Sequence, residues 1–298
     1  MNNVDLVLEG GGMRGIFTAG VLDAFLENEI EFKRVFGVSA GACHAASFLS
    51  GQKKRAYNIG VDYLDDKRYC SIYSLITTGD LFGAKFAYDE IPNKLNLYDY
   101  DAFNKNKTEF YATVTNVETG EAEYVKINDM KKDIIYVRAS SSLPLVSKIV
   151  KANGKKYLDG GIADSIPVRH SLETGSGKSV VILTQHSEYR KEPSFSSKLI
   201  KLLYFKYPKF SQKAIDRYLI YNDTLSYIDE EEKKGNLFVI RPDTKLPIGR
   251  IEKNKEALSN VYNTGYEKGK AVMENLKAFL EKEWEIFVIC TKKLDKRV

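Results

Sequence analysis

Short runs of apolar residues alternate along the chain with longer segments in which apolar positions recur at helical spacing. Four of the short runs predict buried strands, and they lie at residues 4–8, 34–38, 180–184 and 237–240. Between the first two runs, the apolar residues of segment 16–26 have the spacing of a helix. Strands that alternate with helices in this way predict an α/β sandwich.

A different pattern stands in the middle of the chain. Residues 110–117 and 123–127 are rich in β-branched and aromatic side chains and flank Glu118-Thr119-Gly120-Glu121, which predicts a β-hairpin. Beyond Asp216 the pattern is helical and densely charged, as in segment 251–285, and such charges are typical of solvated faces. The apolar run 286–290 fits either a strand or an unstructured tail.

Two glycine-containing motifs follow the first two predicted strands. The first is Gly10-Gly11-Gly12-Met13-Arg14-Gly15, and the second is Gly37-Val38-Ser39-Ala40-Gly41. Each lies at a strand-to-helix turn, where backbone N–H groups of the helix N-terminus are free to face an anion. Together they set such N–H groups near a serine, and acyl transfer needs that pair of features: a nucleophile and a site for an oxyanion.

The first motif alone also fits a dinucleotide-binding loop, since Gly10, Gly12 and Gly15 satisfy G-x-G-x-x-G. Such a loop requires an acidic residue at the end of the second strand to bind the ribose. The second strand ends in Ser39 instead, which disfavours this interpretation. Glycines with a purely structural role remain an alternative for the loop.

Ser39 stands in G-x-S-x-G, in which small neighbours permit a sharp turn that exposes the hydroxyl. The alternative is a structural role, in which the serine only caps the following helix. A nucleophilic serine needs a base, and the chain has three histidines: His44, His170 and His186. His44 lies more than one turn along the helix that Ser39 begins, so it is not expected to reach the hydroxyl.

His186 is the stronger rival, because Ser39, Asp159 and His186 follow the serine, acid, histidine order of α/β-hydrolases. Those enzymes, however, usually have several strands before the nucleophile, whereas Ser39 follows the second. Asp159 is the other candidate base. It ends the strand-like segment before Gly160-Gly161, which suits a carboxylate projected from a tight turn, although a turn aspartate that binds its own backbone has the same pattern.

Taken in order, these motifs, with Ala139-Ser140-Ser141-Ser142-Leu143-Pro144 before Asp159-Gly160-Gly161, resemble the patatin-like phospholipases over roughly the first 170 to 190 residues. The resemblance implies a three-layer α/β/α sandwich with a mostly parallel sheet. It also implies a Ser39–Asp159 dyad without histidine and an oxyanion hole in the loop Gly10 to Gly15. The serine and aspartate motifs would depend on four further glycines in supporting roles: Gly37, Gly41, Gly160 and Gly161. Arg14 occupies the basic position of the family's loop.

On this resemblance we expect a catalytic domain over residues 1–190 and a mainly helical extension over 191–298. The predicted function is hydrolysis of fatty-acyl esters of phospholipids or related lipids, with a lipid as substrate and no cofactor. An acyltransferase with the same dyad, or a catalytically idle lipid-binding module, are the alternatives. The motifs say nothing of the headgroup, the acyl position or the oligomeric state.

Charge and cysteine content narrow further the classes of protein to which this sequence can belong. The net charge of +5, from 45 basic and 40 acidic residues, does not imply nucleic-acid binding. Cys43, Cys70 and Cys290 are widely spaced, so neither disulfides nor a metal site are expected. The N-terminus lacks the features of a secretory signal and no apolar run is long enough to span a bilayer, which predicts a cytoplasmic protein.

One segment has an unusual distribution of charge. Between Glu192 and Asp216 there are five lysines and no acidic residue, interleaved with aromatic and aliphatic side chains. Segment 194–213 could therefore lie on a lipid surface, with peripheral membrane contact, or cover an acyl-binding groove. The structural alternative is a helix that packs on the main domain and turns its lysines to solvent.

Overall fold

The structure is a computed structural model that describes residues 3–281. Residues 286–290 and Cys290 lie outside the described residues. In the described part, one eight-stranded mixed sheet has the strand order β5-β6-β3-β2-β1-β7-β8, and β4 also pairs with β3. The strands are β1 (Asp5–Leu8), β2 (Arg34–Val38), β3 (Glu109–Asn116), β4 (Ala122–Ile127), β5 (Val150–Ala152), β6 (Lys155–Asp159), β7 (Ser179–Ile182) and β8 (Leu237–Ile240).

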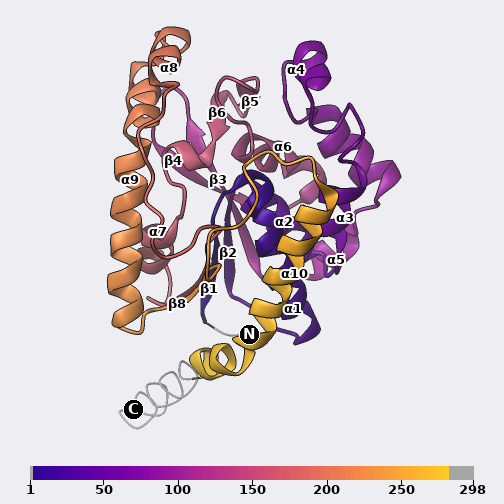
Figure 1. Ribbon diagram of the computed structural model, residues 1–298, viewed down its shortest axis with the longest axis vertical. Coiled ribbons are helices and arrows are strands. Elements are labelled where there is room, and N and C mark those ends of the chain that lie inside the picture. Colours follow the sequence, from indigo (N-terminus) through magenta and orange to yellow (C-terminus); the bar gives the residue numbers. More distant parts are fainter. Residues whose placement is uncertain (1–2, 282–298) are drawn as a thin grey trace, which may run out of the picture.

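Helices cover both faces of this sheet. The α-helices are α1 (Ile16–Glu27), α2 (Ala40–Leu49), α3 (Arg55–Asp62), α4 (Ile72–Thr78), α5 (Tyr100–Lys105), α6 (Met130–Ser140), α7 (Val168–Thr174), α8 (Ser197–Leu203), α9 (Pro208–Lys233) and α10 (Lys255–Ala271). The structure also has two 3-10 turns, η1 (Gly12–Gly15) and η3 (Gly160–Ile162), and a π-helix, η2 (Phe86–Leu95). After a turn at Val272, residues 273–281 are helical as well. In Figure 1, α7 and α9 lie on one side of the sheet, and α1, α2 and α10 lie on the other.

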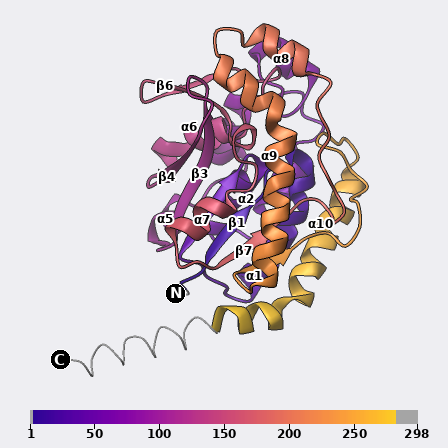
Figure 2. The same ribbon diagram turned by 90° about the vertical axis from the view of Figure 1, so that its left-hand side faces the viewer.

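Alternation along the strands produces these layers. On β1, Leu6 and Leu8 belong to the large core beneath α1, α2 and α10, whereas Val7 belongs to the core beneath α7 and α9. The long helix α9 runs along the outside of its face (Figure 2). The predicted α/β/α sandwich is thus confirmed, and the predicted hairpin is the antiparallel pair β3–β4.

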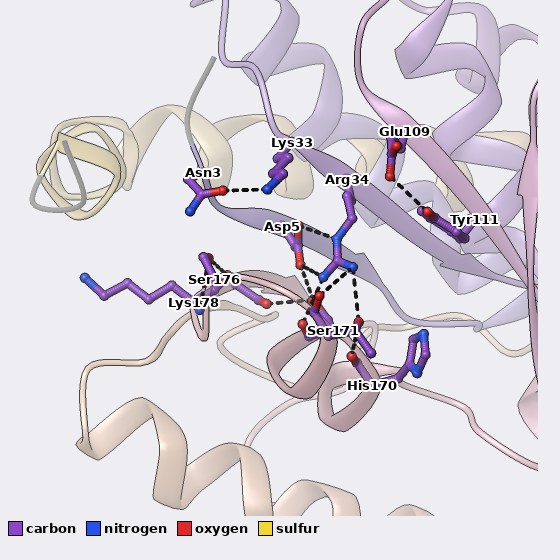
Figure 3. A network of polar contacts seen from close by, with 12 residues as sticks. Asn3, Asp5, Lys33, Arg34, Glu109, Tyr111, His170, Ser171, Ser176 and Lys178 are labelled. Carbon is purple, nitrogen blue, oxygen red and sulfur yellow. Dashed lines mark hydrogen bonds and ion pairs between the residues drawn. The ribbon is translucent and has the colours of Figure 1, made fainter. Parts of the chain in front are cut away.

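The strands β8, β7, β1, β2 and β3 are mutually parallel, so their carboxyl ends lie at one edge of the sheet. The opposite edge is held by a buried polar network (Figure 3). There Arg34, the first residue of β2, forms an ion pair with Asp5, the first residue of β1, and donates to the carbonyl of Ser171 at 3.0 Å. The Ser171 hydroxyl donates to Asp5 at 3.0 Å and lies 2.8 Å from that of Ser179. The network joins the starts of three strands to α7.

Helix α10 packs closely on α1. A Cβ atom on Gly20 would lie 2.2 Å from the Tyr262 carbonyl oxygen, and one on Gly265 would lie 2.0 Å from that of Phe17. Only glycine permits this approach of the two backbones. Through this contact the chain beyond β8 contributes Leu258 and other apolar side chains to the same core as β1.

Candidate active site

Strand register brings Ser39 and Asp159 to neighbouring positions. Val38, the last residue of β2, pairs with Thr113 of β3, and Asp159, the last residue of β6, pairs with Val114. Strand β4 occupies the other edge of β3, so β6 continues the sheet on the side of β2, just past its end. Ser39 follows Val38 directly and therefore lies beside Asp159.

The backbone at Ser39 turns sharply. Its φ of 54° and ψ of −123° lie in a region that residues with a side chain rarely adopt. The Ser39 N–H donates to Ser140 Oγ at 2.9 Å, and the Ser140 hydroxyl donates in turn to the Thr113 carbonyl at 2.6 Å. Ser140 therefore links the turn to the sheet. This is the strained strand-to-helix elbow that G-x-S-x-G predicts.

Asp159 is 1% exposed, and its two carboxylate oxygens have different surroundings. Oδ1 accepts the Gly161 N–H at 2.8 Å. Oδ2 is buried and has no hydrogen-bond partner among residues 3–281. Burial raises the pKa of Asp159, while the charge of Arg217 and the nearby Ser39 hydroxyl oppose this rise. Asp159 thus keeps one buried carboxylate oxygen that no hydrogen bond occupies within residues 3–281, and the Ser39 hydroxyl is close enough to lower the pKa of this group.

The loop Gly10 to Gly15 runs past this pair. Among the described residues, the N–H groups of Gly11 and Gly12 make no hydrogen bond, whereas Gly10 donates to Ser165 O at 3.5 Å and Met13 donates to Arg250 O at 3.0 Å. Gly12 has a φ of +59°, and a Cβ there would lie 2.6 Å from the Arg250 carbonyl oxygen. Within the described part, Gly11 and Gly12 therefore offer two free donors in the loop for which the resemblance implied an oxyanion hole.

The remaining motif residues, Arg14 and five glycines, are packed closely among other groups. The Arg14 guanidinium has a buried Nε without a partner among the described residues, and burial lowers its pKa. The remaining glycines let neighbouring groups approach closely, since an added Cβ would meet an atom within 3.0 Å at each of them. They are Gly15, against His44; Gly37, against Ala42; Gly41, against Leu8; Gly160, against Thr113; and Gly161, against Arg217.

An apolar cavity of about 180 Å³ opens beside Ser39. Its walls come from η1, α2, α3, η2 and α6, and they are mainly aliphatic and aromatic. Lining residues include Met13, Ile16, Tyr69, Phe82, Tyr88, Met130, Ile134 and Val137. Pockets of this composition suit an alkyl chain, with few polar groups to fix its orientation.

The three histidines have other environments. His44 lines the cavity, and burial lowers its pKa to about 4, so it is neutral at pH 7. His170 stacks on Tyr124 with ring centroids 3.6 Å apart, and His186 packs edge-on against Tyr189. None of them forms a hydrogen bond with Ser39 within the described part. Cys43 also lines the cavity, and its Sγ lies 3.4 Å from Ser141 Oγ.

Ser140 belongs to a motif that carries the resemblance, but the motif did not predict that Ser140 supports the elbow through the Ser39 N–H. Ser165 and Arg217 carry no signal in the sequence pattern. Ser165 accepts hydrogen bonds from Nε and Nη2 of Arg217, at 3.3 and 3.2 Å, and its hydroxyl donates to Gly161 O at 2.7 Å. Arg217 comes from α9, far along the chain, and long-range contacts of this kind cannot be read from local spacing.

Comparison with known proteins bears directly on this arrangement. A family model described as patatin-like phospholipase matches residues 6–172, which is more than half of the chain. The chain belongs to the patatin-like phospholipase family. A second model, described as a domain of unknown function, matches residues 207–281.

Relatives of this patatin-like chain include proteins with and without a described activity. YjjU of Escherichia coli is 27% identical over 268 residues, 88% of this chain and 74% of YjjU. Lysophospholipase nte1 of Emericella nidulans is 30% identical over 58% of this chain, and NTE1 of Saccharomyces cerevisiae is 29% identical over 58%. The chain spans only 11% and 10% of these two fungal proteins. The family supports lipid-ester hydrolysis as the class of activity.

The described residues of this family member include no helix with the length and apolarity needed to cross a bilayer.

Proposed function

We propose that this protein is a serine hydrolase that cleaves fatty-acyl esters of phospholipids or related lipids, with Ser39 as nucleophile and Asp159 as general base. The observation that carries the proposal is the buried Oδ2 of Asp159, which has no hydrogen-bond partner in the described part of the chain, beside a serine in a strained elbow. Burial raises the pKa of Asp159, which makes its carboxylate a stronger base than an exposed aspartate.

The reaction follows from these positions. Asp159 Oδ2 accepts the proton of the Ser39 hydroxyl as Oγ attacks the ester carbonyl, and the N–H groups of Gly11 and Gly12 stabilise the oxyanion. Protonated Asp159 then returns the proton to the leaving alcohol, and the acyl group stays on Ser39. Water attacks this ester with Asp159 again as base, which releases the fatty acid and restores the serine.

The cavity supports a fatty-acyl substrate. It opens at Ser39 and is lined mainly by apolar side chains, so an acyl chain bound there would hold its ester carbonyl at the nucleophile. We propose residues 1–190 as the unit that carries this chemistry. In the same proposal, residues 191–298 are the extension that completes the core through β8 and α10.

We also propose that the enzyme binds lipid surfaces peripherally through segment 194–213. This segment contains α8, on which Leu202 and Leu203 are 68% and 59% exposed, and Phe205 follows with 68%. Helix α4 lies at the same end of the molecule (Figure 1), and there Ile72 and Ile76 are 73% and 77% exposed. We call α4 and α8, with these exposed apolar side chains, the two apolar tips. Their position at one end, with lysines on α8, suits binding to an anionic bilayer.

The direct test is hydrolysis of a short-chain p-nitrophenyl ester and of lysophospholipid by the wild type, Ser39→Ala and Asp159→Asn, with folding checked by circular dichroism. We expect each variant to lose at least a thousandfold in kcat while remaining folded. His186→Ala is the matched control for the rival triad, and we expect it to stay active. If His186→Ala abolishes turnover, the dyad is wrong.

Two other outcomes would change the assignment. Release of acylated alcohol instead of free fatty acid, when glycerol or a lysolipid is added as acceptor, would identify an acyltransferase with the same residues. A folded wild type that binds lipid but cleaves no ester would identify a lipid-binding module.

A further inference from the structure

Four basic side chains lie together beside Asp159, and they come from segments far apart in the sequence. We call Arg14, Lys191, Arg217 and Arg250 the basic cluster. Burial and the positive charges of Arg217 and Arg250 lower the pKa of Lys191 to about 7. Burial and the charge of Arg250 lower the pKa of Arg217 to about 10. Geometry agrees for Arg217, because a Cβ on Gly161 would lie 2.9 Å from Arg217 Nη2 and 3.0 Å from Asp159 Oδ1.

Backbone and side-chain contacts fix these residues at the site. The Arg250 carbonyl accepts the Met13 N–H at 3.0 Å, which ties its loop to the glycine loop. The Lys191 N–H donates to Asn222 Oδ1 of α9 at 2.8 Å, and the ammonium group lies 4.5 Å from the centre of the Tyr221 ring. Arg217 is held by its hydrogen bonds to the Ser165 hydroxyl.

The basic cluster has fewer acidic than basic groups around it. Within residues 3–281, none of its four members forms an ion pair, and the two carboxylates whose charges act on it are Glu9 and Asp159. Glu9 makes its hydrogen bonds to neutral groups. Glu9 Oε1 accepts the Tyr221 hydroxyl at 2.7 Å, and Oε2 accepts the N–H and hydroxyl of Thr184 at 2.6 and 3.0 Å. The buried Nε of Arg14 has no acceptor there either. Four basic groups, three of them partly buried, beside two carboxylates leave an excess of positive charge, and a bound anion reduces the cost of burying it.

The position of the basic cluster relates it to the reaction. Its members do not line the apolar cavity, although Gly12 and Met13, which adjoin Arg14, do. The charges of Arg217 and Arg250 act on Asp159. An ester with its acyl chain in the cavity and its carbonyl at Ser39 would therefore direct its alcohol half toward the basic cluster.

We propose that Arg14, Lys191, Arg217 and Arg250 form a phosphate-binding subsite that recognises the headgroup phosphate on the alcohol half of the ester. This inference rests on the proposed function for the orientation of the substrate. Arginine binds phosphate oxygens in bidentate geometry, and lysine adds a point charge. The same chemistry would also bind free inorganic phosphate, so the test must separate the two sources.

The test compares two soluble short-chain substrates below their micelle-forming concentrations: a lysophosphatidic acid and the monoacylglycerol with the same chain. The measured quantity is the ratio of their kcat/KM values, which does not depend on the folded fraction of a preparation. We expect this ratio to fall at least tenfold in Lys191→Met and in Arg250→Met, since each loses a charged partner of the phosphate. Arg190→Met, which removes the neighbouring charge outside the basic cluster, should leave the ratio within twofold.

Binding measurements separate this subsite from the hydrolase activity. In a Ser39→Ala background, calorimetry should find the affinity for the lysophosphatidic acid reduced at least tenfold by Lys191→Met or Arg250→Met. This result would support the subsite even if the wild type cleaved no ester. An unchanged ratio together with unchanged lipid affinity overturns the proposal. So does a loss of affinity for inorganic phosphate alone, because the cluster would then hold a free anion.

Discussion

Ser39 adopts an unfavourable backbone conformation, and a hydrogen bond to a single neighbouring side chain helps to hold it. Its φ of 54° costs on the order of 1–3 kcal/mol in a residue with a side chain. The Ser140 hydroxyl accepts the Ser39 N–H and donates to Thr113, so it joins the elbow to β3. Ser140 is thus a positioning residue for the proposed nucleophile.

We expect Ser140→Ala to lower kcat by at least tenfold with a smaller effect on KM, because it loosens the elbow without altering the cavity. It should also destabilise the protein by about 1–3 kcal/mol, since a buried N–H loses its acceptor. Steady-state kinetics and urea denaturation would measure both. Ser142→Ala is the matched control: Ser142 lies just after α6, its hydroxyl donates to the Arg138 carbonyl of that helix, and its loss should leave kcat nearly unchanged.

Asp159 makes stability depend on pH. Its pKa is raised by burial in the folded protein, so folding favours the protonated form. The contribution is fully present below the pKa of an unfolded aspartate, about 3.9, and is lost as pH rises through the folded value. We therefore expect Asp159→Asn to melt above the wild type at pH 7 and the difference to shrink toward pH 4. A difference in Tm that does not change with pH would contradict this account.

At the scale of elements, the sequence predicted what local periodicity encodes. The strands β1, β2, β7 and β8 are confirmed within one or two residues, because buried parallel strands are short continuous apolar runs. The β3–β4 hairpin is confirmed for the same kind of reason: a turn sequence separates two β-rich runs. What periodicity could not supply was the pairing of β6 with β3 beyond the end of β2, which brings Asp159 to Ser39.

The candidate site likewise contains residues that the sequence singled out and residues that it did not. Ser39, Asp159 and the glycine loop stand out because each follows a strand and carries a recognisable motif, and their roles stay predictions. Lys191, Arg217 and Arg250 could not be selected from 45 basic residues, since only tertiary packing brings them to the glycine loop. Likewise, no pattern distinguished the free N–H groups of Gly11 and Gly12 from the occupied one of Met13.

The α1–α10 contact provides a test at this scale. A Cβ added at Gly265 would lie 2.0 Å from the Phe17 carbonyl oxygen, so the two helices would have to separate. We expect Gly265→Ala to destabilise the protein by roughly 1–3 kcal/mol or more, which is the range for overpacked cores. Thermal and urea denaturation would measure the loss.

Gly60→Ala is the matched control, because Gly60 lies inside α3 and an added Cβ would make only an ordinary contact, 3.5 Å from Ile16 Cδ1. The same substitution should there stabilise the protein by about 0.5–1 kcal/mol through helix propensity. Equal effects at the two positions would show that the close approach of α1 and α10 has no energetic weight.

At the scale of the whole molecule, the candidate site and exposed apolar surface lie toward one end. Ser39 follows the carboxyl end of β2, whereas the Asp5–Arg34 network lies at the other end of the strands. Helices α4 and α8 both project from the end opposite the start of β1 (Figure 1). A protein that rests on a bilayer through these two tips would hold its site near the lipid.

Vesicle flotation would test this orientation. The variants Ile72→Ser with Ile76→Ser, on α4, and Leu202→Ser with Leu203→Ser, on α8, each remove two exposed apolar side chains. We expect either pair to weaken partition at least tenfold, because each buried aliphatic side chain contributes about 1.5–3 kcal/mol. Leu219→Ser is the control, since Leu219 is 54% exposed in the middle of α9.

The lysines of α8 should add an electrostatic component. Lys198→Glu with Lys201→Glu should abolish the preference for anionic over zwitterionic vesicles, because each lysine near the surface contributes about 1 kcal/mol of attraction. If the lysine variant binds both kinds of vesicle like the wild type, segment 194–213 does not contact the membrane. If only the α8 pair weakens binding, a single tip inserts and α4 faces water. In that case hydrolysis of vesicle lipid should depend on α8 alone.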